Sequence, residues 1–248
     1  KGSGNLLTFG VFDIPNSTNT LFTPGIYTNG VYGSINISNI KEDIKHSWYA
    51  GSSTHPSNGD TIPSYGKSGA YSWLKSPRYN GEVYEVGPLA RMFMNKEYTR
   101  GISVMDRHMA RALETKKIAA EMTNWINQVS TTASAYTQLP LPQSGVGVGL
   151  TEAPRGGLGH WLNFASQQTT KYQIVTPTCW NVSPRDDLGK MGPLEQALIG
   201  TKVVDINQPI ELLRIVHSFD PCTGCSIHVI DSERNIKAKF VVSTPNPN

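Results

Sequence analysis

Short apolar runs separated by Gly, Pro, Asn and Ser fill the first third of the chain, from Leu6 to about Arg78. Short runs bounded by turn-forming residues are typical of strands. Within this stretch, residues 25–32 carry the pair Asn29-Gly30 between β-prone side chains, which is the strongest short-range signal for a β-hairpin. The pattern predicts β ribbons and loops, with one short helix at about Ile40–Tyr49.

A different pattern runs from about Thr99 to Ser130. Apolar residues recur there at three- and four-residue spacing, which is the period of a helix with one buried face. Neither Pro nor Gly occurs between Gly101 and Ser130, and Lys, Arg and Glu occupy the other face. The apolar positions are Ile102, Met105, Met109, Ala112, Leu113, Ile118, Met122, Trp125, Ile126 and Val129. We expect the longest helix of the chain here, with one break near Thr115 and with its methionines in the core.

The stretch from Leu139 to Gly159 is rich in Pro and Gly. Its run of alternating Gly and Val at 145–149 resembles a dinucleotide-binding loop only superficially. The run follows Pro140 and Pro142 and opens no convincing helix, so we expect no nucleotide site.

Shorter elements complete the pattern. Glu195–Ile199 and Glu211–Phe219 are predicted helices, each entered after a Pro. Residues 229–230 and Lys237–Val242 alternate as in a small hairpin, and 245–248 form a loose tail. The chain as a whole predicts an α+β fold, with β ribbons and loops up to about Arg78 and packed helices beyond it.

Composition narrows the functional classes. Of the 248 residues, 38% are hydrophobic and 17% are charged, while 23 Gly and 16 Pro indicate many turns and long ordered loops. A formal net charge of +3 is too small for a nucleic-acid-binding surface, so we expect no nucleic-acid partner. No apolar run approaches the roughly 18–20 residues that a membrane-spanning helix needs. Three cysteines do not indicate a disulfide framework.

The most distinctive cluster of metal-ligating residue types is Asp220-Pro221-Cys222-Thr223-Gly224-Cys225-Ser226-Ile227-His228. Two thiols three residues apart can bind one metal ion, and a His three residues further on can reach a second ion nearby. The spacing also fits a structural zinc half-site, a redox dithiol or a chance pair of core cysteines. On spacing alone, a metal role and these alternatives stay open.

The same nine residues resemble the C-terminal cysteine motif of the large subunit of nickel–iron hydrogenases. Five further blocks resemble the family and follow its order along the chain. They are His46–Tyr49, Pro77–Tyr79, Glu85–Arg91, Glu152–Gly156 with Gly159–Trp161, and Pro177–Asn181 with Pro184–Asp186. The resemblance covers essentially the whole chain. It implies the C-terminal half of a larger, helix-rich large subunit.

This resemblance implies reversible oxidation of dihydrogen to protons and electrons at a nickel–iron centre. In the family four thiolates hold the nickel; Cys222 would be a terminal ligand and Cys225 would bridge nickel and iron. The iron carries carbon monoxide and cyanide ligands, which Pro154, Arg155 and Thr178 would border. Such ligands need fixed donors in a dry pocket.

Further roles follow from the resemblance around that centre. Cys222, Arg155 and Asp220 form the implied catalytic group, in which the Cys222 thiolate would accept a proton. Arg155 would place its positive charge at the open coordination site, since a guanidinium does not readily lose its proton. Asp220 would form an ion pair with Arg155. His228 would bind a remote magnesium-type (or iron) ion, with the carbonyl of Ile174 as a second ligand.

Two departures from the family pattern concern the extent of the chain. The family's Arg-x-Cys-Gly-x-Cys motif, which supplies the other two nickel thiolates, does not occur in this sequence. Either the large subunit is split into two chains, or the sequence is a piece of a longer one. The sequence begins at Lys1 without Met, which favours the second expectation. The family is normally cut directly after the His of the C-terminal motif. We therefore expect residues 1–228 to be the hydrogenase part and 229–248 to be an extension that a maturation endopeptidase removes.

The resemblance also implies partners and a location. Electrons would leave through an iron–sulfur small subunit, because this chain cannot ligate such clusters. We expect a periplasmic or membrane-associated enzyme with a cytoplasmic precursor. Two alternatives remain: a metal-free relative in the lineage of respiratory complex I, and an inactive fragment that binds zinc through its two cysteines. Both Cys222 and Cys225 are present, which argues against the first alternative.

Overall fold

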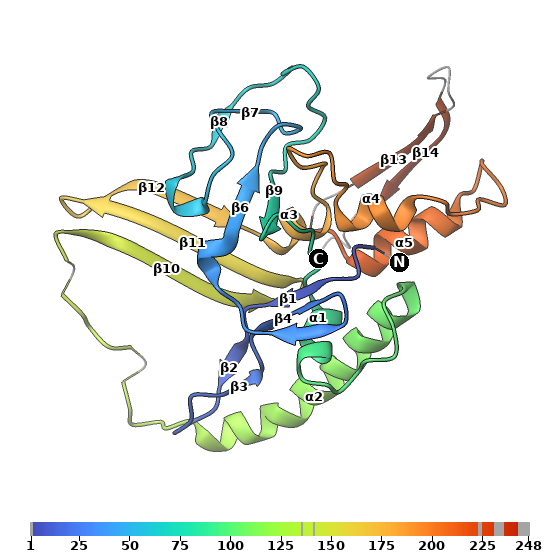
Figure 1. The fold of residues 1–248 in the computed structure, drawn as a ribbon. Coiled ribbons are helices and arrows are strands. Elements are labelled where there is room, and N and C mark those ends of the chain that lie inside the picture. Colours follow the sequence, from blue (N-terminus) through green and yellow to red (C-terminus); the bar gives the residue numbers. More distant parts are fainter. Residues whose placement is uncertain (1, 135, 141, 223–224, 231–235, 243–248) are drawn as a thin grey trace.

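The computed structural model describes residues 2–134, 136–140, 142–222, 225–230 and 236–242 (Figure 1). Its elements, in chain order, are β1 (Leu6–Thr8), β2 (Val11–Asp13), β3 (Thr20–Phe22), β4 (Gly25–Thr28), β5 (Val31–Gly33), η1 (Ile37–Asn39), β6 (Ile40–Asp43), β7 (Tyr49–Ala50), η2 (Pro56–Asn58), β8 (Ile62–Pro63), β9 (Ser76–Tyr79), α1 (Pro88–Met94), α2 (Val104–Gln128), β10 (Ser144–Ala153), β11 (Gly156–Ala165), β12 (Gln168–Val175), α3 (Pro177–Asn181), α4 (Pro193–Leu198), α5 (Ile210–Phe219), β13 (Cys225–Ile230) and β14 (Ile236–Val242). Strands and helices take comparable shares, so an α+β fold is confirmed and its helix-rich character is not.

The ribbons expected in the first third are confirmed. β1 pairs with β4 and β4 with β5, both antiparallel, and β2 pairs with β3. The β4–β5 turn is Asn29-Gly30, both with positive φ, as a tight hairpin requires. The helix expected at 40–49 is wrong, because its first residues form β6 and pair with β9. Ile40 and Glu42 are buried and Lys41 between them is exposed, which is the two-residue alternation of a strand.

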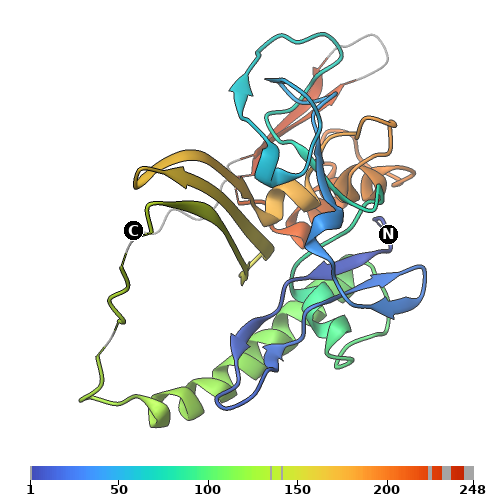
Figure 2. The same cartoon turned by 60° about the vertical axis from the view of Figure 1, so that its left-hand side comes forward.

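Strands β10, β11 and β12 form an antiparallel meander that the sequence pattern did not predict. The expectation of packed helices after Arg78 is therefore wrong for residues 144–175, which Figure 2 shows as long strands side by side. The Gly-Val run at 145–149 lies in β10, with Gly149 opposite His160. Alternating Val suits a strand, and ten consecutive pairs with β11 supply the backbone partners that define it.

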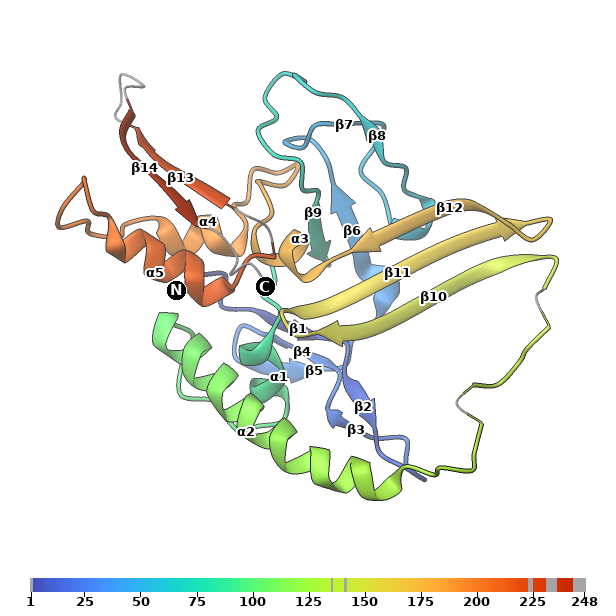
Figure 3. The same cartoon turned by 180° about the vertical axis from the view of Figure 1, so that it is seen from behind.

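Helix α2 confirms the long helix expected between Thr99 and Ser130. Its first turn is capped by Ser103, whose hydroxyl accepts the Asp106 N–H at 3.2 Å. The helix continues through Thr115 without the expected break. Figure 3 shows it running along one side of the molecule, with α1 between it and strands β1 and β4.

The methionines of α2 are not in the core, contrary to expectation. Met105, Met109 and Met122 are 66%, 41% and 53% exposed, respectively. The buried face is instead formed by Arg107, Ala110 and Glu114, spaced three and four residues apart. Two of these are ionic and have buried partners: Arg107 pairs with Glu85 and Glu114 with Arg91. The ionic face thus holds the helix to this chain together with Leu113 and Ile118, which pack against the core, while the three methionines face outward.

The core lies in three clusters around these elements. One joins α1 and α2 to β1 and β3, and includes Leu6, Phe22 and Leu89. A second, around Trp161 and Trp180, joins the meander to α3 and to the first strands. A third packs α4 against α5. No helix among the described residues is long and apolar enough to cross a bilayer.

The elements near the C-terminus agree with expectation. The two short helices are α4 and α5, within two residues of the predicted bounds. The small hairpin is formed by β13 and β14, in which Cys225 lies opposite Val242. Of the predicted extension 229–248, the structure describes 229–230 and 236–242. The loose tail predicted at 245–248 lies outside the described residues.

Candidate active site

The cysteine motif begins where α5 ends. Asp220, directly after the last helical residue, adopts a left-handed conformation (φ 50°) and donates its N–H to the carbonyl of His217 at 3.1 Å. A left-handed residue followed by Pro stops a helix, because Pro has no N–H and cannot continue the hydrogen bonding. The chain therefore leaves α5 here and brings Cys222 to an exposed position.

Arg155 lies at the turn between β10 and β11, where Ala153 pairs with Gly156. Its Nε donates to the carbonyl of Asp220 at 2.9 Å and lies 3.2 Å from Oδ2 of the same residue. Its Nη1 lies 3.8 Å from Sγ of Cys222. The hairpin turn and the cysteine motif, far apart in the sequence, thus meet through one guanidinium.

Thr178 reaches the same place from α3. The hydroxyl of Thr176 caps this helix by accepting the N–H of Cys179 at 3.4 Å, and Thr178 lies in its first turn. Oγ1 of Thr178 accepts the N–H of Cys222 at 3.2 Å. The cap and this hydrogen bond place the Thr178 hydroxyl directly beside the backbone that carries the first thiol.

A cavity of about 330 Å³ lies beside Cys222. Its lining is mostly apolar, with Arg155, Thr176, Thr178 and the thiol as its polar members. The lining residues are Leu74, Ala153, Pro154, Arg155, Leu158, Thr176, Pro177, Thr178 and Cys222. Four residues singled out in the sequence therefore share one cavity, and Asp220 is bonded to one of them.

The other residues singled out in the sequence are not brought to this cavity by any described contact. Ile174 lies in β12 with a 44% exposed side chain, opposite His160 in β11. Cys225 and His228 lie on β13, but their side chains are outside the described part of the chain. Among the described residues, no group of three or more His, Cys, Asp or Glu side chains is arranged to hold a metal ion.

A buried ionic cluster next to this site was missed by the sequence analysis. Arg91 of α1 pairs with Glu114 of α2 and Glu152 of β10, at 2.6 and 2.7 Å. It also donates to the carbonyls of Ala153 and Pro154, which directly precede Arg155. Burial raises the pKa of Glu152, although Arg91 opposes the shift. Arg91 belongs to the Glu85–Arg91 block, but no sequence pattern predicts its contact with Glu152, some sixty positions away.

A second buried cluster lies beside Ile174. Nζ of Lys75 is 3.0 Å from Oε1 of Gln173 and 3.7 Å from Oε2 of Glu42. Burial raises the pKa of Glu42, and its Oε2 has no hydrogen-bond partner within the described structure. Gln173 also donates to the carbonyl of Gly59 at 3.2 Å, which anchors the end of β12. The three charged or polar groups come from distant segments, so no local sequence pattern predicts their contact.

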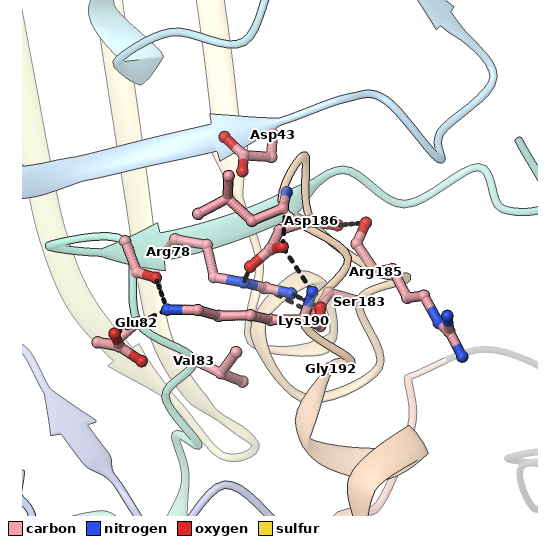
Figure 4. A network of polar contacts seen from close by, with 12 residues as sticks. Asp43, Arg78, Glu82, Val83, Ser183, Arg185, Asp186, Lys190 and Gly192 are labelled. Atoms are coloured by element: carbon pink, nitrogen blue, oxygen red, sulfur yellow. Dashed lines mark hydrogen bonds and ion pairs between the residues drawn. The ribbon is translucent and has the colours of Figure 1, made fainter.

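Figure 4 shows a third buried network, centred on Arg78 and Asp186. Nε of Arg78 donates to Oδ2 of Asp186 at 2.9 Å, and both side chains are almost fully buried. Asp186 also accepts the N–H groups of Leu188 and Lys190 at 3.0 and 2.8 Å. This network ties β9 to the loop after α3. Within the described part of the chain, Arg78 and Asp186 form no hydrogen bond with a residue that lines the cavity.

Comparison with known proteins places these features in a family. A family model described as nickel-dependent hydrogenase matches residues 1–102 and 94–228. The large subunit of the periplasmic [NiFeSe] hydrogenase of Desulfomicrobium baculatum is 38% identical over 260 residues, covering 94% of this chain and 51% of that protein. The hydrogenase-2 large chain of Escherichia coli K12 is 32% identical over 283 residues, covering 95% and 50%.

Solved structures agree. The Ni-Fe-Se hydrogenase from D. vulgaris Hildenborough in the reduced state superimposes with a TM-score of 0.84 at 36% identity, over 89% of this chain and 52% of that chain. A reduced, active form of the enzyme from Desulfomicrobium baculatum gives a TM-score of 0.83 at 38% identity. The chain spans about half the length of these relatives. Matched along nearly its whole length by sequence and by structure, the chain belongs to the nickel-dependent hydrogenase family.

Proposed function

We propose that this chain is the C-terminal half of the large subunit of a nickel–iron hydrogenase, which reversibly oxidises dihydrogen to protons and electrons. The observation that carries the proposal is the meeting of Cys222, Arg155 and Thr178 at one largely apolar cavity. The family membership supplies the reaction class.

The residues present fit a nickel–iron centre with carbon monoxide and cyanide on the iron. Cys222 offers an exposed thiol, and soft thiolates suit nickel. The cavity beside it has room for small ligands, and its lining is mostly apolar. Cys222 and Cys225 would hold the metals of this centre through their sulfurs. When bound, the centre supplies the electrophilic site at which dihydrogen is polarised.

The protein's own groups divide the remaining work. The sulfur of Cys222 is the base that takes the proton, because a terminal thiolate keeps more of its charge than a bridging one. Nη1 of the positively charged Arg155 guanidinium lies 3.8 Å from that sulfur. Asp220 accepts from Nε through its backbone carbonyl, and its partly exposed carboxylate forms an ion pair with the same nitrogen.

Thr178 and Pro154 complete the cavity wall. Because Oγ1 of Thr178 accepts the Cys222 N–H, its own O–H is available to donate into the cavity, where a cyanide nitrogen would accept it. Pro154 also lines the cavity, and it adds no N–H donor to this wall because Pro has none.

A second metal site is part of the proposal. His228 and the carbonyl of Ile174 would bind a magnesium-type (or iron) ion. Gln173, next to Ile174, is held by Lys75 and by the carbonyl of Gly59, so the end of β12 that offers this carbonyl is anchored. An anchored carbonyl suits an ion such as Mg²⁺, which demands near-ideal geometry.

The remaining partners follow from the half-length match. The N-terminal half of the large subunit would supply two more thiolates, and an iron–sulfur small subunit would take the electrons. Residues 229–248 would be removed by a maturation endopeptidase, leaving 1–228. The mature enzyme would be periplasmic or membrane-associated, as the names of its relatives indicate for them, and its precursor cytoplasmic.

The test compares two cysteine variants of the complete large subunit, matured together with its small subunit. Cys222→Ser should lose nickel, the infrared bands of carbon monoxide and cyanide, and hydrogen-dependent dye reduction. Cys179→Ser is the matched control, because the thiol of Cys179 is hydrogen-bonded to the Thr176 hydroxyl and Cys179 is not among the residues that line the cavity. A wild-type protein with zinc and without those bands would refute the proposal. So would a Cys222→Ser variant that keeps both metal and bands.

A further inference from the structure

We infer that Arg91 is a positioning residue for Arg155, acting through the backbone of the β10–β11 turn. The inference rests on the proposed function of the cavity beside Cys222. Its physical content concerns only described residues of this chain: α1 carries Arg91, and the turn carries Arg155.

All five N–H donors of Arg91 are used. Nε and Nη2 donate to the two carboxylate oxygens of Glu114 at 2.7 and 2.6 Å. Nη1 donates to Glu152 Oε2 at 2.7 Å and to the carbonyl of Ala153 at 3.1 Å. Nη2 also donates to the carbonyl of Pro154 at 2.9 Å. One planar guanidinium therefore connects a carboxylate of α2 with three acceptors on residues 152–154, at the end of β10 and directly after it.

Glu152 is fixed from its other side as well. Its Oε1 accepts the backbone N–H of Phe9 at 2.7 Å. The segment 152–154 is thus held at the side chain of Glu152 and at two successive carbonyls. The next residue is Arg155, so the direction in which its side chain leaves the backbone is set by these bonds.

The start of α1 touches the same turn directly. Gly87 caps α1 with φ 123°, and a Cβ at this position would lie 2.9 Å from the carbonyl oxygen of Arg155. Only a residue without a side chain allows this approach. Helix α1 therefore contacts the turn both at its first turn and through Arg91, one helical turn further on.

The bonds of Arg155 itself are too weak to fix its geometry. Its side chain is 30% exposed and that of Asp220 is 42% exposed, so water competes for their ion pair. Exposed ion pairs contribute only about 0–1 kcal/mol. Arg91 is only 2% exposed, and its buried contacts are the ones that hold the turn.

A matched control exists in the same chain. Arg78 is also 2% exposed, and all five of its donors are used, on Asp186, Ser183 and three backbone carbonyls. It makes no bond to residues 152–155. A change to Lys at either position keeps the charge and removes the five-donor fork, because Lys has only three donors on a single nitrogen.

The experiment uses the complete large subunit with its small subunit and compares Arg91→Lys with Arg78→Lys. We expect Arg91→Lys to lower kcat for hydrogen oxidation about tenfold or more, with little change in KM, because small displacements of a positioned group cost rate. It should also shift the cyanide infrared bands and speed amide hydrogen exchange in residues 153–157. Arg78→Lys should leave the bands and this exchange unchanged, whatever it does to Tm.

A double-mutant cycle separates positioning from general damage. If Arg91 acts through Arg155, then Arg91→Lys should slow the enzyme no further in a background of Arg155→Lys. Full additivity would refute the inference. Glu114→Gln provides a milder perturbation of the same fork should Arg91→Lys not fold, and it should produce the same spectral shift.

The outcomes separate the two proposals. A wild-type enzyme without cyanide bands refutes the proposed function, whereas the exchange measurement still tests the role of Arg91 on the turn. Suppose instead that the wild-type enzyme shows the cyanide bands. The positioning role alone is then refuted if Arg91→Lys and Glu114→Gln both leave the bands, kcat and amide exchange unchanged.

Discussion

Gly156, directly after Arg155, offers a sharp test of how tightly the turn is packed. A Cβ added there would lie 2.5 Å from Cγ2 of Val86 and 2.7 Å from the backbone nitrogen of Gly87. The backbone nitrogen cannot move aside as a flexible side chain would. Gly156 also has φ +133°, a conformation that side-chain-bearing residues rarely adopt.

The expected cost of Gly156→Ala has two parts. Overpacking in a dense interior costs about 1–3 kcal/mol, and a strained φ costs about 1–3 kcal/mol. Together these give an expected loss of about 2–6 kcal/mol. At roughly 2–4 °C per kcal/mol for chains of this size, Tm should fall by about 4 °C or more. Thermal unfolding followed by circular dichroism measures it.

Two other glycines separate the two parts. Gly66→Ala introduces a side chain at φ +77° with nothing within 4 Å, so it reports the conformational cost alone. Gly147→Ala, in β10, places a Cβ no closer than 3.9 Å to Leu162 and reports neither cost. The packing argument is refuted if Gly156→Ala lowers Tm no more than Gly66→Ala.

Three further predictions concern other parts of the fold. Asp186→Ala leaves Arg78 buried without its carboxylate, so the free energy of unfolding should fall by about 3–5 kcal/mol in urea denaturation. Burial and a hydrogen bond to Glu195 raise the pKa of Tyr71 from 10 to about 12. The stability that this shift contributes is therefore present below pH 10 and is lost as the pH rises through 12. Tyr71→Phe should abolish this loss in alkaline unfolding curves. Met122→Gln should change the unfolding free energy of this chain by less than about 0.5 kcal/mol, because the side chain is exposed; a larger loss would show that it packs against something.

Local patterns predicted the elements whose partners lie nearby in sequence. The β4–β5 hairpin follows from Asn29-Gly30, and α2 follows from its helical period and from Ser103 as its cap. The residues of the candidate site came from a different source. Cys222, Arg155 and Thr178 were found through resemblance to family blocks, and their contacts then brought them to one cavity.

Other features could not be predicted from a local pattern. The Gly-rich sequence of β10 shows no apolar alternation typical of a strand, and β10 is defined by its pairing with the adjacent strand β11, which supplies partners for its backbone. The outward face of α2 is another case. Its methionines have the spacing of a buried stripe, yet the buried side of the helix is chosen by Arg107 and Glu114, whose partners Glu85 and Arg91 lie in other segments.

The same contrast explains how the candidate site is built. The groups with proposed chemical roles, Cys222, Arg155 and Asp220, are exposed or partly exposed, and an exposed ion pair contributes about 0–1 kcal/mol. Such contacts cannot hold a guanidinium in one orientation. The turn that carries Arg155 is held instead by two buried residues, Arg91 and Gly87, because the loss of a buried contact costs more free energy. Activity in this protein should therefore be as sensitive to these two buried residues as to the partly exposed groups they support.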